Sequence, residues 1–350
     1  MTMTNTPKID ILSLSLEELE DEIIRLGEPK FRAKQIYSWI TKGCFGSEMR
    51  NIPVALQNKL NEVFEFRLPK VNKKLSSQLD GTIKYLFELI DGECIESVFM
   101  KYEHGNTLCI SSQVGCRMGC KFCASTLAGR VRNLEPSEML GQIIAATKDT
   151  GERISNVVMM GIGEPLDNYD NTIKFLRLVS SENGLNIGLR HISLSTCGLV
   201  DKIDRLSKEH LPVTLSVSLH AYDNQVRSGI MPVNNKFPIE LLLGACNRYF
   251  EETGRRISFE YTLIAGKNDT VEGAIALAKL LKKYIKGSCH VNLIPLNEVK
   301  ETRLETSKNV NNFKNKLISL GINATVRRKL GSDINASCGQ LRRQSKEETQ

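Results

Sequence analysis

Three cysteines stand close together in the run from Gly115 to Ala124, which reads Gly-Cys-Arg-Met-Gly-Cys-Lys-Phe-Cys-Ala. The spacing of Cys116, Cys120 and Cys123 is C-x3-C-x2-C, and it predicts a metal centre. A cubane iron-sulfur cluster needs four ligands, so three thiolates leave one iron with an open coordination position where chemistry can take place. The spacing leaves two alternatives open, which are a structural zinc knuckle and a four-cysteine cluster with a distant fourth thiolate.

The composition is typical of an enzyme from a reducing compartment. The chain has 350 residues, of which 41% are hydrophobic, and this length favours one large domain with a smaller one. Ten cysteines are too sparse and too unevenly spaced for a disulfide scaffold. No apolar run reaches the roughly 18 residues of a membrane span, and the N-terminus lacks the features of a signal peptide. We therefore expect a cytoplasmic protein.

The net charge is modestly basic, at +7 with a sequence pI near 8.8. Basic residues gather in two places, from Arg67 to Lys74 and in the C-terminal run that contains Arg327, Arg328 and Lys329. Such a distribution permits a polyanionic partner but does not identify it.

The first part of the sequence, residues 1–66, predicts a small helical domain. Ser15 and Glu18 form a capping-box pattern ahead of apolar residues at helical spacing. Two further helices are expected, from Phe31 to Ile40 and from Val54 to Phe64. Because three short helices bury little surface by themselves, we expect them to dock on the rest of the molecule.

Residues 67–106 change to a period of two. Apolar side chains alternate from Ile83 to Leu89 between two Asp-Gly turn signals, and a second strand runs from Ile95 to Tyr102. This segment predicts a β-hairpin extension that leads into the core.

The core, residues 107–300, alternates strands with amphipathic helices. The expected strands span residues 107–112, 156–160, 191–196, 213–219, 257–264 and 289–295, and the expected helices span residues 136–148, 170–179, 199–207, 239–249, 271–284 and 306–320. Six β-α units in succession predict an α/β fold with a parallel partial (β/α)6 barrel. Residues 301–350 then supply the last helix, a seventh strand at 324–329 and a tail that contains Cys338.

Reactive groups of parallel barrels gather at the C-terminal ends of the strands. The first strand leads to the cysteine run, and the second leads to Gly163 and Glu164 in the sequence Met-Gly-Ile-Gly-Glu-Pro. The later strands end at polar residues, which are Ser195, the run Ser218 to His220, and Asn297. Singly these residues are ordinary helix caps, but together they predict one polar pocket.

Five segments resemble the RlmN/Cfr family of radical S-adenosylmethionine enzymes. They are Cys-Ile-Ser-Ser-Gln-Val-Gly-Cys-Arg-Met-Gly-Cys-Lys-Phe-Cys-Ala-Ser, Met-Gly-Ile-Gly-Glu-Pro-Leu-Asp-Asn-Tyr, Ser-Leu-His-Ala, His-Val-Asn-Leu-Ile-Pro and Asp-Ile-Asn-Ala-Ser-Cys-Gly-Gln-Leu, and the likeness runs from Phe31 to Leu341. The resemblance implies the radical SAM barrel fold, a [4Fe-4S] cluster on the three cysteines, and S-adenosyl-L-methionine, used twice per turnover. The implied activity is methylation of C2 of one adenine in 23S rRNA and of the adenine beside the anticodon in tRNA.

The resemblance also implies a role for each site residue. Cys338 takes a methyl group from one cofactor molecule, and a second molecule gives the radical that activates this methyl group for addition to adenine. Cys109 then resolves the covalent adduct by forming a disulfide with Cys338. Glu96 matches the proposed acid-base carboxylate of the family.

The cofactor contacts implied by the resemblance are Gly163, Glu164, Ser195, Ser218, Leu219, His220 and Asn297. The partners that it implies are 23S rRNA, tRNA and an external electron donor such as flavodoxin, with the enzyme as a monomer. Methylation at C8 of the same rRNA adenine, as in the Cfr branch, stays open, because no residue decides the position by a physical argument. Two other functional classes also stay open. One is a radical enzyme that acts on a protein or small molecule, and the other is a zinc-binding RNA module without catalytic activity.

Overall fold

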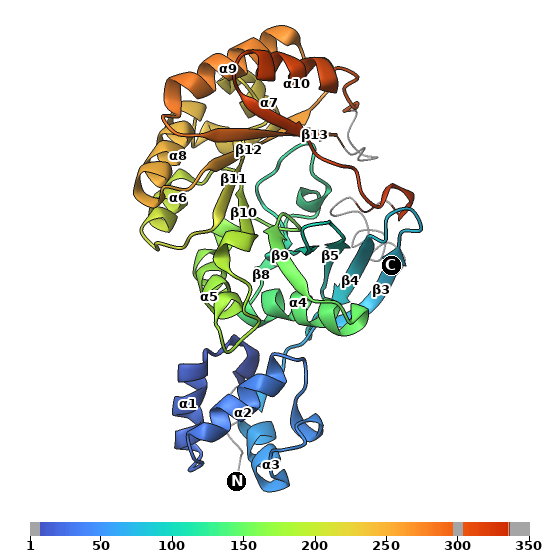
Figure 1. The fold of residues 1–350 in the computed structure, drawn as a ribbon, viewed down its shortest axis with the longest axis vertical. Coiled ribbons are helices and arrows are strands. Elements are labelled where there is room, and N and C mark those ends of the chain that lie inside the picture. Colours follow the sequence, from blue (N-terminus) through green and yellow to red (C-terminus); the bar gives the residue numbers. More distant parts are fainter. Residues whose placement is uncertain (1–7, 297–303, 335, 337–350) are drawn as a thin grey trace.

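The computed structural model describes residues 8–296, 304–334 and 336. Its main feature is a ten-stranded sheet in the order β14-β13-β12-β11-β10-β9-β6-β5-β4-β3 (Figure 1). The parallel part of this sheet comprises β6 (Asn106–Cys109), β9 (Ile154–Met159), β10 (Ile192–Thr196), β11 (Thr214–Ser218), β12 (Ile257–Leu263), β13 (Cys289–Pro295) and β14 (Asn323–Val326). Strands β14 and β3 are its two edges, so the barrel is open. The predicted α/β partial barrel is confirmed.

Helices follow the parallel strands and cover the outer face of the sheet (Figure 1). They are α4 (Pro136–Thr150), α5 (Tyr169–Ser180), α6 (Val200–Ser207), α8 (Ile239–Thr253), α9 (Val271–Tyr284) and α10 (Val310–Ser319). A further helix of seven residues, α7 (Asn224–Ile230), lies between β11 and α8 and was not predicted because it is short.

Alternation along the strands separates two faces of the sheet. On β10 and β11, Leu194, Leu215 and Val217 are fully buried in the main hydrophobic core under the helices. The residues between them face the barrel interior and are polar. Ser193 and Ser216 are diagonal neighbours there, with their hydroxyl oxygens 2.9 Å apart. The barrel interior is therefore a polar surface enclosed by an apolar shell.

The predicted hairpin extension is part of the same sheet. Strands β4 (Ile83–Glu88) and β5 (Cys94–Met100) form an antiparallel pair, and β5 also pairs with β6. The sheet therefore extends without a break from the hairpin into the barrel. A third strand, β3 (Lys70–Ser76), lies outside β4 and was not predicted. Its sequence carries three lysines and few apolar residues, as is common for an exposed edge strand.

The N-terminal helices are α1 (Leu16–Arg25), α2 (Phe31–Ile40) and α3 (Val54–Val63), and they lie at one end of the molecule (Figure 1). The predicted capping box exists, since the Ser15 side chain accepts from the Glu18 N–H and the Glu18 carboxylate accepts from the Ser15 N–H. Short strands β1 (Ile9–Asp10) and β2 (Phe64–Glu65) pair in parallel and close this part of the chain.

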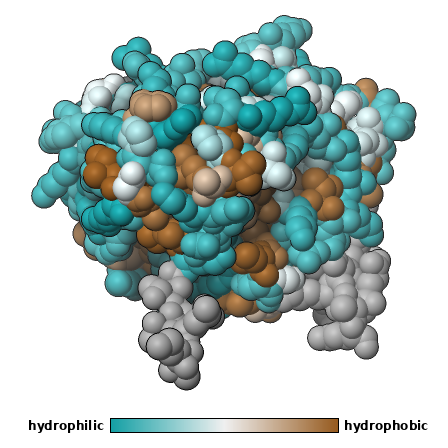
Figure 2. Space-filling view, turned by 90° about the horizontal axis from the view of Figure 1, so that it is seen from below, coloured by the Kyte–Doolittle hydropathy of each residue, from teal (hydrophilic) through white to brown (hydrophobic). Residues whose placement is uncertain are grey.

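The N-terminal helices share the hydrophobic core of the barrel rather than standing apart from it. The Ser137 N–H at the start of α4 donates to Ser13 Oγ at 3.1 Å, and Lys174 pairs with Glu18 at 3.0 Å. Figure 2 views this end of the molecule, whose surface is largely hydrophilic with separate apolar patches. The division into four segments at residues 66, 106 and 300 stays a prediction.

No helix among the described residues is long and apolar enough to cross a membrane.

Gln142 on α4 links the helix layer to the strands that carry the cysteines. It is fully buried, and its Oε1 accepts from Ser97 Oγ at 2.7 Å and from the Ser111 N–H at 2.8 Å. Its Nε2 donates to the Ser111 and Glu138 carbonyls at 3.0 and 3.1 Å. One side chain thus satisfies four polar groups that have no access to water.

We predict that Gln142→Leu lowers the free energy of unfolding by about 3 kcal/mol, because it leaves several buried polar groups without partners. Chemical denaturation of the full chain under anaerobic conditions measures this loss. Lys148→Met on the exposed part of the same helix is the control, with a change within about 0.5 kcal/mol. Equal stabilities of the two variants would contradict this account of Gln142.

Candidate active site

The cysteine run forms a loop that is closed at its base by a small two-stranded sheet. Strand β7 (Gln113–Gly115) pairs with β8 (Arg130–Asn133), so both ends of the loop leave from one ladder. The Cys116 N–H donates to the Gly129 carbonyl at 3.0 Å. Gly115 has φ +77, and a Cβ there would lie 2.0 Å from the Gly129 oxygen, so only glycine fits. The glycine before the first cysteine therefore permits the closure of the loop.

The loop brings the three cysteines together. Cys116 and Cys120 are buried and Cys123 is half-buried. Burial raises the pKa of Cys116 to about 12, and the nearby Glu164 carboxylate and Cys123 thiolate add to this rise. Burial also raises the pKa of Cys120, again with contributions from the other two cysteines. The charges of the neighbouring cysteines thus add to these rises in pKa, and a bound cation would relieve the repulsion among the thiolates.

This donor set fits an iron-sulfur cluster. Soft thiolates are the ligands that iron-sulfur clusters require, and each of three cysteines would hold a different iron. Within the described part of the chain, no three His, Cys, Asp or Glu side chains are arranged to hold a single metal ion. A cubane does not need that arrangement, because its irons are spread over four corners.

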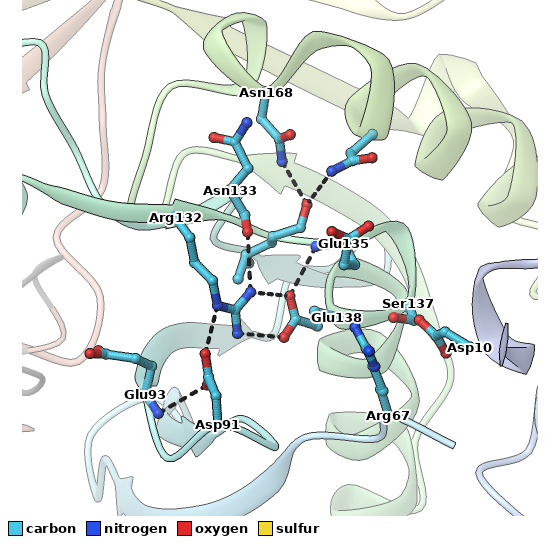
Figure 3. Close-up of polar contacts among 12 residues, drawn as sticks. Asp10, Arg67, Asp91, Glu93, Arg132, Asn133, Glu135, Ser137, Glu138 and Asn168 are labelled. Atoms are coloured by element: carbon cyan, nitrogen blue, oxygen red, sulfur yellow. Dashed lines mark hydrogen bonds and ion pairs between the residues drawn. The ribbon is translucent and has the colours of Figure 1, made fainter. Parts of the chain in front are cut away.

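Arg132 fixes the end of the loop where it enters α4 (Figure 3). Its guanidinium makes a bidentate pair with Glu138 at 2.7 and 2.8 Å and donates to Asp91 in the β4–β5 turn at 2.7 Å. The hydrogen bonds to Glu138 raise the pKa of Arg132 further above its already high value. Asn168 completes the base of the loop, since its Nδ2 donates to the Ser112 and Leu134 carbonyls at 2.9 and 2.7 Å.

Asp167 joins the cysteine loop to the Gly-Glu-Pro turn. Its carboxylate accepts from Gln113 Nε2 at 2.9 Å, from Arg130 Nη1 at 3.1 Å and from Arg117, the residue that follows the first cysteine. Hydrogen bonds and charges from these neighbours keep the pKa of Asp167 below its usual range even though burial opposes them. The two motifs that the sequence suggested separately are therefore held as one unit.

Gly163 and Glu164 lie at the C-terminal end of β9, as predicted. Gly163 has φ +111, and a Cβ there would lie 2.7 Å from the Gln113 nitrogen. The Glu164 carboxylate is buried and accepts from the Leu166 N–H at 3.0 Å and from the Cys197 N–H at 2.7 Å. Burial raises the pKa of Glu164, while the hydrogen bond from Cys197 opposes that rise. Glu164 thus has a structural function as well as a carboxylate that could accept from a ligand ammonium.

Arg227 on α7 is the site residue that sequence reasoning missed. Its side chain is fully buried, and its donors reach the carbonyls of Cys197 at 2.7 Å and of Ser218 and Leu219 at 3.1 Å. Asn234 accepts another of its hydrogen bonds at 3.1 Å. Burial lowers the pKa of Arg227 to about 10, so the guanidinium stays charged at neutral pH. This one cation fixes the ends of β10 and β11.

The predicted polar residues after these strands lie near one another. Ser195 and Ser218 are half-buried on the inner face, with Ser195 opposite Ser216 and Ser218 opposite Glu260 in the register. Leu219 is instead fully buried in the hydrophobic core, so any contact with a ligand in the interior would come from its backbone.

His220 has a clear structural function. Its Nδ1 accepts from the Thr262 N–H at 2.8 Å, and burial lowers its pKa to about 3, so the ring is neutral with its proton on Nε2. Its backbone is left-handed, with φ 56, which is uncommon for a residue other than glycine. The ring packs edge-on against Phe122 of the cysteine motif, with centroids 4.8 Å apart. His220 therefore supports the cysteine loop from the opposite side.

Cys109 and Glu96 lie on the neighbouring strands β6 and β5. Cys109 is buried opposite Val98, and alternation along β5 places Glu96 on the same face of the sheet as Val98. Glu96 is also buried, and its carboxylate pairs with the Lys84 ammonium at 3.1 Å. The structure thus brings a thiol and a carboxylate to one face, beside the cysteine loop that follows β6.

Two predicted site residues, Asn297 and Cys338, lie outside the described residues. Residues 304–334 and 336 before Cys338 are described, and Leu330 and Ala336 pack against the small apolar cluster of Val98, Met100 and Cys109. Asp333 holds this segment by accepting from Ser77 Oγ at 2.7 Å and from the Gln78 N–H at 2.9 Å, on the turn between β3 and β4.

Arg327 differs from the exposed basic residue that its run suggested. It is half-buried, and its Nη1 lies 3.8 Å from the Met160 sulfur. Burial raises the pKa of Glu260, and the positive charge of Arg327 opposes that rise. Arg328 and Lys329 beside it are exposed. Arg327 therefore belongs to the barrel interior.

Comparisons with known proteins agree with this site. The model of the radical SAM superfamily matches residues 110–310, which include the cysteine loop and the strands after it. A radical SAM methyltransferase from Sphaerobacter thermophilus has a similar structure, with a TM-score of 0.90 and 41% identity over 95% of this chain and 98% of that one. The fold and the cysteine loop define a radical SAM enzyme.

Residues 9–66 match the N-terminal domain model described as that of a ribosomal RNA large subunit methyltransferase. A protein of Clostridium novyi named probable dual-specificity RNA methyltransferase RlmN is 53% identical over 95% of this chain and 98% of its own length. One of Clostridium botulinum with the same name is 55% identical over 95% of this chain and 96% of its own length. The chain belongs to the RlmN family of the radical SAM superfamily.

We predict that Gly163→Ala lowers the free energy of unfolding by about 1 to 3 kcal/mol, because the backbone there is accessible only to glycine and the added Cβ meets Gln113. Gly188→Ala is the matched control, since a Cβ there would have its nearest neighbour at 3.7 Å and its φ is −58. Thermal and chemical unfolding of both variants measure the difference. A Gly163→Ala protein as stable as Gly188→Ala would contradict the strained turn.

Proposed function

We propose that this protein methylates C2 of an adenine in 23S rRNA and of the adenine beside the anticodon in tRNA. The proposal includes a [4Fe-4S] cluster on Cys116, Cys120 and Cys123, two molecules of S-adenosyl-L-methionine per turnover, and a methylated Cys338. The RNA methyltransferase names of relatives that are 53% to 55% identical over 95% of the chain support the substrate class.

The observation that carries the proposal is the position of Ala336. This residue packs against the apolar cluster of Val98, Met100 and Cys109, and only Ser337 separates it from Cys338. Two residues of extended chain span at most about 7 Å. A thiol this close along the chain to the cluster that contains Cys109 supports a reaction that uses one thiol as methyl carrier and a second thiol as resolving nucleophile.

The residues have distinct tasks in this reaction. Cys338 accepts a methyl group as a thiolate, so that an S–C bond forms as the sulfonium C–S bond of the donor breaks. Cys109 later attacks the Cys338 sulfur, so that an S–S bond forms as the C–S bond to the base breaks. The methylene carbon left on the base keeps the electron pair of that bond and takes up a proton, which completes the methyl group and leaves a disulfide. Glu96 acts as the acid-base group on the same face.

The proposed cofactor pocket lies at the ends of the neighbouring strands. Glu164 would accept from the ammonium of the methionine moiety, and Ser195 and Ser218 would contact the rest of the molecule with Asn297 and the backbone of residues 219–220. When bound, the cluster and S-adenosylmethionine supply one-electron chemistry, which C2 of adenine requires because this carbon has no lone pair for polar methyl transfer.

RNA binding involves the N-terminal helices and the exposed basic residues Arg328 and Lys329. A base that is paired or stacked cannot reach a buried site, so the target adenine must be turned out of its helix or loop. An external electron donor such as flavodoxin, and a monomeric enzyme, complete the proposal.

Mass spectrometry of nucleosides tests the proposal. The 23S rRNA and tRNA of cells that lack the protein should contain no 2-methyladenosine at its target positions, and returning the gene should restore it. A return of 8-methyladenosine instead would favour the C8 alternative, and unchanged RNA in both strains would contradict RNA methylation.

We predict that Cys338→Ala abolishes RNA methylation, because no other thiol carries the methyl group. We predict that Cys109→Ala accumulates a covalent complex between RNA and protein, because the adduct forms but is not resolved. Denaturing gels and mass spectrometry detect the complex. Cys44→Ala, in the N-terminal helical part, is the control and should retain full activity. Turnover by Cys338→Ala would indicate a radical enzyme of another mechanism.

A further inference from the structure

Lys84 and Glu96 form an ion pair with almost no contact with solvent. Their side chains are 1% and 3% exposed, and Lys84 Nζ lies 3.1 Å from Glu96 Oε2. By contrast, the ion pairs of Lys74 with Asp149 and of Lys101 with Glu152 each have a side chain that is at least 36% exposed. A buried ion pair contributes little net stability compared with apolar residues of the same size, so stability alone does not explain its presence.

The register of the sheet explains how the pair forms. Lys84 lies opposite Val98 on β5, and Glu96 lies opposite Leu86 on β4, so the two charged residues are diagonal neighbours on one face. The opposite face carries Tyr85, Phe87 and Ser97, which pack in the core or bind Gln142. Lys84 and Glu96 therefore point toward the interior side that also carries Cys109.

The backbone of Glu96 is fixed as well. Ser111 Oγ donates to the Glu96 carbonyl at 2.6 Å and accepts from the Ile162 N–H at 3.0 Å. This connects β5 to the Gly-Glu-Pro turn and to the chain just before the cysteine loop. The carboxylate of Glu96 is thus held at both its backbone and its head group.

We propose that Lys84 is a positioning residue of the reaction, whose ammonium group keeps the Glu96 carboxylate ionised and directed at the face where the adenine is bound. This inference rests on the proposed function, in which Glu96 accepts the proton that leaves C2. In that step the C2–H bond breaks, an O–H bond forms on Glu96, and the bonding electron pair stays on the purine. The surplus single electron of the adduct would return to the oxidised cluster, which supplies one electron at the start of the reaction. A buried carboxyl group without a nearby cation would hold its proton and could not act as this base.

Other ionisable groups near this face must be considered in a pH experiment. Those on the described residues are Lys73 on β3, Glu88 on β4, Cys94 on β5, Cys109 on β6, Tyr102 after β5 and Arg327 over Met160. Of these, Cys109 belongs to the proposed machinery, so its own titration is common to all variants and cancels in the comparison between them.

The experiment uses the full chain, reconstituted anaerobically, with 23S rRNA fragments and tRNA as substrates. Two quantities are measured for each variant, namely the methyl content of Cys338 by mass spectrometry and the rate of 2-methyladenosine formation as a function of pH. In Lys84→Met, methylation of Cys338 should stay within about twofold, because that step does not use Glu96. Formation of 2-methyladenosine should fall about 10²-fold at neutral pH, the typical effect of losing a general base.

The pH profile separates this role from a merely structural one. In Lys84→Met the Glu96 carboxylate loses its ion-pair partner, so the dependence of the rate on pH should differ from that of the wild type. Lys84→Arg keeps the charge and should follow the wild-type profile. Glu96→Gln should be slow at every pH. Lys101→Met, which removes a solvent-exposed ion pair with Glu152, is the control and should match the wild type.

A Lys84→Met enzyme with the wild-type rate and profile would overturn the inference while leaving the proposed function intact. If Lys84→Met does not fold, the double variant Lys84→Met/Glu96→Gln removes both charges and leaves no lone buried ion. Its rate should equal that of Glu96→Gln, and a further loss beyond that variant would overturn the inference. A wild-type enzyme that makes no 2-methyladenosine would instead contradict the proposed function itself.

Discussion

Two buried charges of opposite sign organise the site, and they meet at one residue. The Glu164 carboxylate accepts from the Cys197 N–H, and the Arg227 guanidinium donates to the Cys197 carbonyl, each at 2.7 Å. Because a buried charge without partners is very costly, neither side chain can move away without a large penalty. The ends of β9, β10 and β11 are therefore fixed relative to one another. The cysteine loop is bound to the same unit through Asp167.

The sheet gives this site two neighbouring regions with different chemistry. Its parallel part presents the polar groups that fit a zwitterionic nucleoside ligand, and its antiparallel part presents Cys109, Glu96 and Lys84. The cysteine loop leaves the sheet after β6, where the two parts join. A group generated at the loop would therefore meet the thiol and the carboxylate within the same interior, protected from water by the apolar shell outside.

Much of this could be predicted from the sequence, because it depends on local patterns. Alternation of apolar residues predicted the parallel strands, and the short spacing of the three cysteines predicted that they share one loop. The residues that fix these parts were missed because their partners are distant in sequence. Arg227 binds carbonyls of residues 197, 218 and 219, and Lys84 reaches Glu96 across two strands. Lys84 stands between Ile83 and Tyr85, and a lone lysine between apolar residues is a signal for such a contact, but it does not identify the partner.

The central claim is that three thiolates hold a cluster with one iron free to bind S-adenosylmethionine. Electron paramagnetic resonance of the reduced, anaerobically reconstituted protein tests it most directly. The account predicts the signal of a reduced [4Fe-4S] cluster, with g-values that change when S-adenosylmethionine is added, because the cofactor becomes a ligand of the open iron. A cluster signal that the cofactor leaves unchanged, or a protein that binds zinc and gives no signal, would contradict the account.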